Sequence, residues 1–151
     1  MGKTFGEFKD YMELNQAAEG LFQEGDLDNL KKLAEENGIP EELVNTYDGT
    51  MLCDAQTAAV GALEVELKKL AGQKNALGQL VVNYLSGLCE KEKNALVVFQ
   101  SAGRLKDFVD KTFDEARKKA TGGSFWMSDD DIRGEARRVF IRGKEPWKKQ
   151  K

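Results

Sequence analysis

Apolar residues recur three and four positions apart along most of this chain, a spacing that places them on one face of an α-helix. The clearest stripe runs through Leu105, Phe108, Val109, Thr112, Phe113, Ala116 and Ala120. Similar stripes occupy residues 11–22, 27–34, 59–70 and 77–88. Because the sequence contains only two prolines, little interrupts helix formation. The pattern predicts an all-α fold, a compact helical bundle of about five to seven helices with a small acidic N-terminal helical region.

Short polar residues and glycines mark the expected helix boundaries. Asp10 is placed to cap a first helix, and Glu13 stands three residues later, as in a capping box. Gly25 is expected to end that helix and Asp26 to cap a second one. Gly38, followed by an isoleucine, has the pattern of a helix-ending glycine with its hydrophobic contact.

A short third helix and a turn are predicted next. Pro40 suits the first position of that helix, and residues 47–49 supply the turn. A long helix then begins at Asp54, and a second one ends near Leu88, with a break at residues 71–72. We expect these two helices to pack against each other as a hairpin.

The C-terminal half offers one ambiguous segment and one well-marked helix. Residues 95–99 are apolar on every side, which fits a strand or a helix, and a helix here would be a buried connector. Ser128 can cap a last helix that extends to about Ile141. Met127 can pack on Ile132 as the hydrophobic staple of that helix.

The distribution of charge suggests three regions. We expect residues 1–49 to form a small acidic helical module, residues 50–143 a helical domain, and residues 144–151 a basic tail. Residues 1–49 carry twelve acidic and four basic side chains, a net charge of −8. Residues 133–151 carry eight basic and two acidic side chains, a net charge of +6. The chain as a whole has a net charge of −3, so its two ends are oppositely charged.

The composition indicates a globular protein that stays where it is synthesised. Of the 151 residues, 40% are hydrophobic and 32% are charged, which is ordinary for a folded domain. No apolar run reaches the length of about 18 residues that a transmembrane helix needs. The first residues lead into charged sequence without the apolar region of a signal peptide. We therefore expect a cytoplasmic location, where Cys53 and Cys89 would be buried thiols.

The residue types argue against most catalytic chemistry. The sequence contains no histidine, which removes the commonest general base and the usual zinc ligand. Residues 129–131 are three consecutive aspartates, which suggests a metal site, but capping the amides of a helix N-terminus explains them better. We expect no enzyme activity, no cofactor and no metal.

Candidate partner-binding residues lie at both ends of the chain. They are Glu13, Glu35, Glu36, Glu41 and Glu42 for electrostatic attraction, followed by Trp126 and Arg137. Carboxylates at helical spacing can imitate the phosphates of a nucleic acid and attract lysine and arginine. The alternative is a solvated helical face. The basic C-terminal segment can contact phosphates, or it can simply keep the chain soluble.

Two sets of sequence motifs resemble known families. Residues 80–90, 105–109 and 116–120, with the acidic start of the final helix, are similar to the PcfK-like proteins of conjugative elements. That grouping includes a type II-A anti-CRISPR family that inhibits the RNA-guided nuclease Cas nine. Residues 4–8, 17–21, 24–26 and 33–39 resemble a module common in small mobile-element proteins of Firmicutes.

The resemblance implies a phage or mobile-element protein that blocks CRISPR immunity in its bacterial host cell. It implies stoichiometric, non-enzymatic binding to the type II effector nuclease, with or without guide RNA. Inhibition would come from competition with nucleic acid or from blocking nuclease activation. The alternative is a nucleic-acid-associated accessory protein of a conjugative or other mobile element, which would bind phosphates through its basic tail.

Overall fold

The computed structural model describes residues 8–119 and 128–144 of the chain. The helices are α1 (Tyr11–Gln23), α2 (Leu27–Glu36), α3 (Glu41–Asn45), α4 (Ala55–Leu67), α5 (Gly72–Leu88), α6 (Glu92–Ser101), the 3₁₀ turn η1 (Ala102–Arg104), α7 (Leu105–Lys119), α8 (Asp129–Ala136) and the π-helical segment η2 (Arg137–Ile141). The described residues contain no strand, which confirms the all-α prediction. Across the same ranges, no helix combines the length and the apolar character needed to cross a membrane.

The caps predicted at Asp10, Asp26 and Ser128 are present, and Asp54 caps α4 in the same way. Asp10, Asp26, Asp54 and Ser128 each accept a hydrogen bond from the backbone N–H three residues later, at 2.9, 3.2, 2.7 and 3.1 Å. Glu13 returns a bond by accepting from the N–H of Lys9 at 2.8 Å. These bonds pair N–H groups that lack a partner within their helix, and so they fix where each helix begins.

Two local predictions were wrong. Pro40 precedes α3 as its N-cap residue, with a ψ of 138°, and does not occupy the first helical position. Residues 95–99 are helical, but Leu96 and Val97 are 38% and 37% exposed, so the run is not a buried connector. α6 packs on α4, η2 and α5, and its side with Leu96 and Val97 meets solvent. The proposed staple between Met127 and Ile132 falls partly outside the described residues.

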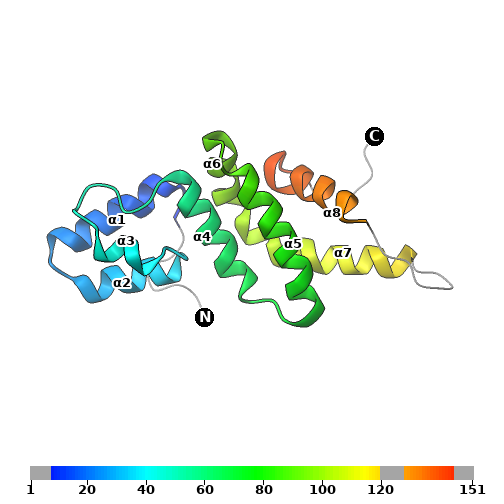
Figure 1. Ribbon diagram of the computed structural model, residues 1–151, viewed down its shortest axis with the longest axis horizontal. Coiled ribbons are helices and arrows are strands. Elements are labelled where there is room, and N and C mark those ends of the chain that lie inside the picture. The colour runs from blue at the N-terminus through cyan, green and yellow to red at the C-terminus, as the bar shows by residue number, and fades with distance from the viewer. Residues whose placement is uncertain (1–7, 120–127, 145–151) are drawn as a thin grey trace.

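The helices are arranged along one long direction (Figure 1). α1, α2 and α3 form one end, α4 and α5 lie in the middle, and α7 and α8 form the other end. α4 packs against α5, which confirms the predicted hairpin, and it packs against α6 as well. We call the end made of residues 8–49 the acidic lobe and the segment of residues 133–144 the basic end.

Buried side chains form two clusters that meet at α4. The smaller cluster joins α1, α2 and α3 to Ala58 of α4 and includes Leu14, Leu30 and Leu33, all fully buried. The larger cluster joins α4 to α8 and η2, where the rings of Phe108 and Phe140 meet edge-on with centroids 5.6 Å apart. Because α4 contributes to both clusters, it holds the acidic lobe on the rest of the molecule.

Candidate functional site

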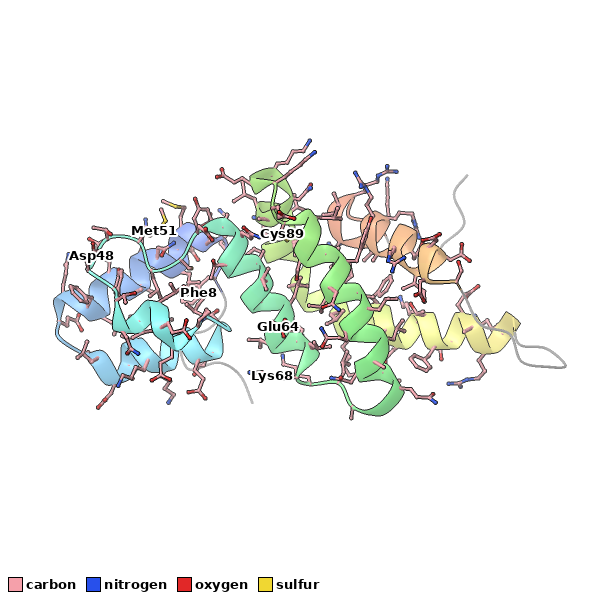
Figure 2. All side chains as sticks on the ribbon, in the orientation of Figure 1. Phe8, Asp48, Met51, Glu64, Lys68 and Cys89 are labelled. Atoms are coloured by element: carbon pink, nitrogen blue, oxygen red, sulfur yellow. The ribbon has the colours of Figure 1, made fainter. Side chains whose placement is uncertain are left out.

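A groove lies where the acidic lobe meets α4. Its volume is about 540 Å³, and it is lined by Lys31, Ala34, Glu35, Gly38, Ile39, Pro40, Glu41, Val44, Glu64 and Lys68. These residues come from α2, the turn after it, α3 and the second half of α4. Figure 2 labels Glu64 and Lys68 on that half of α4. We call this feature the α2–α3–α4 groove.

The turn at Gly38 builds the floor of the groove. Gly38 adopts a left-handed φ of +69°, which lets the Ile39 N–H reach back to the Ala34 carbonyl at 2.8 Å. This bond ends α2 and points Ile39 into the core, where its side chain is 4% exposed. Val44 of α3 is also buried, so the groove has an apolar base under charged walls.

A close backbone contact fixes the width of the groove. A Cβ atom added to Gly38 would lie 2.3 Å from the carbonyl oxygen of Gly61, and one added to Gly61 would lie 2.5 Å from the carbonyl oxygen of Asn37. Only glycine at both positions allows the end of α2 to approach α4 this closely. Glu64 stands one turn after Gly61 on α4 and therefore faces the same side.

The walls of the groove carry charges of both signs. Glu35, Glu41 and Glu64 supply carboxylates from three different helices, and Lys31 and Lys68 supply ammonium groups. Across residues 8–119 and 128–144, none of these five side chains takes part in an ion pair within 4.0 Å. Glu36 and Glu42, the chain neighbours of two lining carboxylates, are not among the residues that line the groove, and Glu36 is only partly exposed.

The structure brings together only part of the predicted binding set. Glu35 and Glu41 line the groove, whereas Glu13 does not and instead accepts the Lys9 N–H at the start of α1. Arg137 is exposed on η2 in the basic end, far along the chain from the groove. Trp126 lies outside the described residues. Sequence reasoning missed Glu64, because its place in the groove depends on a contact between residues distant in sequence.

Arg133 and Arg138 of the basic end, and Arg104 of η1, are engaged within the molecule. Arg138 donates two hydrogen bonds to Glu135, at 2.9 and 2.7 Å, and this contact raises the pKa of the Arg138 guanidinium. Arg133 pairs with Asp130 at 3.2 Å. Arg104 of η1 donates to the Val139 carbonyl at 3.1 Å and so anchors η2. The Arg104 bond holds η2 on η1, and the pairs of Arg133 and Arg138 with carboxylates of the same helical segment reduce the positive charge available to a partner.

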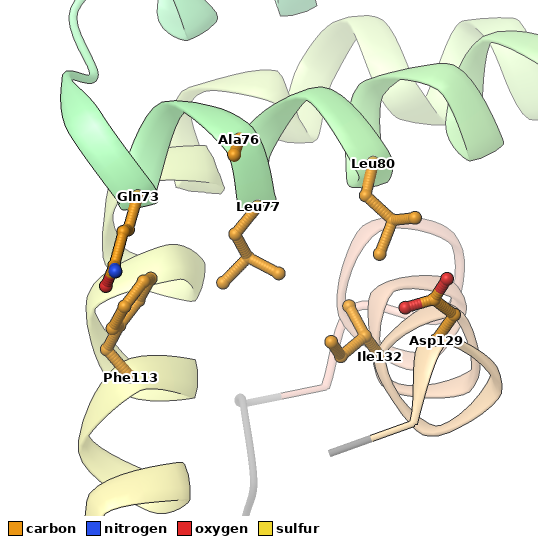
Figure 3. A pocket seen from close by; sticks show the side chains of 7 residues that line it. All are labelled: Gln73, Ala76, Leu77, Leu80, Phe113, Asp129 and Ile132. Carbon is orange, nitrogen blue, oxygen red and sulfur yellow. The ribbon is translucent and has the colours of Figure 1, made fainter. Parts of the chain in front are cut away.

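A second cavity, of about 460 Å³, opens between α5, α7 and α8. Figure 3 shows Leu77 and Leu80 of α5 pointing towards Ile132 of α8, with Phe113 of α7 at the side. Its polar side chains are Gln73 and Asp129, which stand apart in the view. The cleft offers apolar surface and no group of polar side chains suited to catalysis.

The two cysteines are buried in the cores. Cys53 is 4% exposed and Cys89 is fully buried, and both are free thiols, as expected. Burial, with a smaller contribution from Asp54, raises the pKa of Cys53 to about 12, and burial raises the pKa of Cys89 to about 11. Both thiols therefore stay protonated at neutral pH and are poor nucleophiles.

The aspartates at the start of α8 act locally. The N–H of Asp131 donates to the Ser128 hydroxyl, and Asp130 pairs with Arg133. In the described part of the chain, no three histidine, cysteine or acidic side chains cluster in a way that suits a metal ion.

Comparisons with protein-family models, with curated proteins and with solved structures gave no match.

Proposed function

We propose that this protein is a non-enzymatic inhibitor that binds a type II CRISPR effector nuclease through its acidic lobe. The observation that carries the proposal is the concentration of negative charge in residues 8–49, which carry eleven acidic and three basic side chains, a net charge of −8, in a lobe at one end of the molecule. A field of this sign attracts cationic protein surfaces and raises the rate of association with them.

The effector nuclease presents such a surface. It holds the heteroduplex of guide RNA and target DNA in a positively charged channel and reads a short DNA motif with arginines. An acidic helical lobe can occupy that surface in place of nucleic acid, or it can hold a nuclease domain away from its docked position. The nuclease is named as the partner because residues 80–90, 105–109 and 116–120 resemble the anti-CRISPR family. The bacterial cytoplasm is then the place of action.

A reconstituted cleavage reaction tests this proposal. Purified effector, guide RNA and target DNA are mixed with increasing amounts of the protein, and cleavage is expected to stop near one equivalent of protein. Binding of the effector to target DNA, followed by gel shift, distinguishes competition with nucleic acid from a block at the cleavage step. Undiminished cleavage at a large excess of protein contradicts the proposal.

A second candidate function is favoured by the basic end, where residues 133–144 carry five basic and one acidic side chains. A nucleic-acid-associated accessory protein of a mobile element would bind phosphates there. It predicts DNA binding that weakens steeply with salt and is lost when residues 142–151 are removed. We rank it second because Arg133 and Arg138 are already paired with acidic side chains of the same helix.

A further inference from the structure

We infer that the α2–α3–α4 groove binds an arginine side chain of the protein that the acidic lobe recognises. The inference rests on the proposed function for the identity of that partner, and it goes further by assigning the residues that make contact and the chemistry that they recognise. The shape of the groove, the origin of its carboxylates and the rigidity of its walls favour this occupant.

The floor of the groove suits the aliphatic part of a long side chain. Ala34, Ile39 and Val44 are apolar residues of the lobe core that also line the cavity. Arginine and lysine bury their methylene groups on such surfaces and keep the charged end at the edge. A short cation or a bare metal ion would leave this apolar floor uncovered.

The carboxylates above the floor favour the charge of arginine. Glu35, Glu41 and Glu64 reach the groove from α2, α3 and α4, so they approach an occupant from different directions. A guanidinium presents a planar fork of N–H donors and can bond more than one carboxylate at once, whereas an ammonium acts as a point charge. Guanidinium is also more weakly hydrated, so its transfer into a groove costs less.

The two lysines of the groove leave room for this occupant. Lys31 and Lys68 each stand four residues from a lining glutamate of the same helix, and both are exposed. Their long, flexible stems let the ammonium groups turn to solvent when another cation enters. Among the side chains that line the groove, three carboxylates face two ammonium groups, so the local field favours a cation.

The groove is held open before any partner arrives. The contact between Gly38 and Gly61 joins its two walls through backbone atoms, which cannot rearrange as side chains do. A binding site that is already in its bound shape loses less free energy when a ligand is ordered in it. This rigidity distinguishes the groove from the other acidic positions of the lobe, such as Glu19 and Glu24, which lie exposed on and at the end of α1.

The inference is tested with the full-length protein labelled with ¹⁵N and titrated with N-acetyl-arginine methylamide. Chemical-shift changes are expected in the amides of residues 31–44 and 61–68, with weak affinity. The citrulline analogue has the same shape without the charge and is expected to cause no such changes. The double variant E41Q/E64Q is expected to weaken arginine binding by about tenfold. The matched control E19Q/E24Q, in the same lobe, is expected to leave binding unchanged.

The outcomes separate this inference from the proposed function. Three results would each contradict an arginine site in the groove. They are equal chemical-shift changes with the arginine and citrulline analogues, changes spread over the whole lobe, and an unchanged affinity of E41Q/E64Q for the arginine analogue. Nuclease inhibition without arginine binding would also contradict the arginine site, but it would agree with the proposed function. Arginine binding in the groove without nuclease inhibition would sustain the inference and remove the nuclease as its partner. Because the substitutions replace glutamates that have no ion pair in the described residues, they are expected to preserve the fold, which the ¹⁵N spectrum itself reports.

Discussion

At the scale of single residues, Asn15 joins the acidic lobe to the chain that leads into α4. Its side-chain amide donates to the carbonyls of Tyr11 and Cys53 at 3.0 and 2.9 Å. Its carbonyl oxygen accepts from the N–H groups of Leu52 and Cys53 at 2.8 and 3.1 Å. The side chain is 7% exposed and makes all the hydrogen bonds that it can offer in this position.

Replacement of Asn15 by leucine is expected to lower the free energy of unfolding by about 2–4 kcal/mol, because it leaves buried backbone groups of residues 52–53 without partners. Urea denaturation followed by circular dichroism measures this change. The control is Gln16→Ala on the exposed face of the same helix, which is expected to change the stability by less than about 0.5 kcal/mol. Equal stabilities for the two variants would contradict the role of Asn15.

The buried thiols give a second prediction at this scale. The pKa of a cysteine in the unfolded chain is about 8.5, whereas burial raises the pKa of Cys53 to about 12 and that of Cys89 to about 11 in the fold. Above the unfolded pKa, the unfolded chain releases thiol protons that the folded chain retains, so stability is complete below that pH and falls as the pH rises towards the folded values.

Two measurements check this behaviour. A disulfide reagent is expected to label neither Cys53 nor Cys89 in the native protein and to label both in concentrated denaturant. The free energy of unfolding is expected to fall between about pH 8 and about pH 10, and to fall less steeply in Cys89→Ala. Rapid labelling of the native protein would show that the thiols are not enclosed.

At the scale of elements, the contact between the end of α2 and α4 sets the position of the acidic lobe. The substitution Gly61→Ala places a methyl group 2.5 Å from the Asn37 carbonyl oxygen, so the two elements must separate. We expect a loss of about 2–3 kcal/mol in stability.

The matched control is Gly20→Ala within α1, where nothing lies within 4 Å of the added atom. That change is expected to stabilise the protein by about 0.5–1 kcal/mol through helix propensity. Thermal unfolding of the two variants measures both changes in stability. A Gly61→Ala protein as stable as the wild type would contradict the requirement for glycine at the contact between α2 and α4.

The elements also show which features a sequence can predict. Asp10, Asp26 and Ser128 were recognised as caps because each bonds to an amide only three residues away, within one stretch of sequence. Glu64 was not recognised as part of the groove, because its position depends on Gly61 meeting Gly38, a contact that no local pattern reports. The spacing of apolar residues identifies a helix but not how much of it a neighbour covers.

The exposure of Leu96 and Val97 was missed for this last reason. A helix with apolar residues on every side is expected to be buried all round. In this fold α6 packs on α4, η2 and α5, and its outer face with Leu96 and Val97 meets solvent. The fold class and most helix ends therefore follow from the sequence, whereas the groove and the exposed side of α6 require the tertiary arrangement.

At the scale of the whole molecule, charge separation gives the protein an acidic and a basic end. The groove where the acidic lobe meets α4 is lined by charged side chains that have no ion pair in the described residues, whereas Arg133 and Arg138 of the basic end are paired with neighbouring carboxylates. This asymmetry leads us to place the partner-binding surface on the acidic lobe.

The most direct test of this account is a titration of target-DNA cleavage by a type II effector nuclease with two triple variants. E35Q/E41Q/E64Q removes the carboxylates of the groove, and the matched control E19Q/E24Q/D28N removes the same charge from exposed positions of the same lobe. The wild type and the control are expected to inhibit cleavage with potencies within about twofold of each other, and the groove variant is expected to be weaker by about tenfold or more. Equal potency of the two variants, or no inhibition by the wild type, would contradict the account.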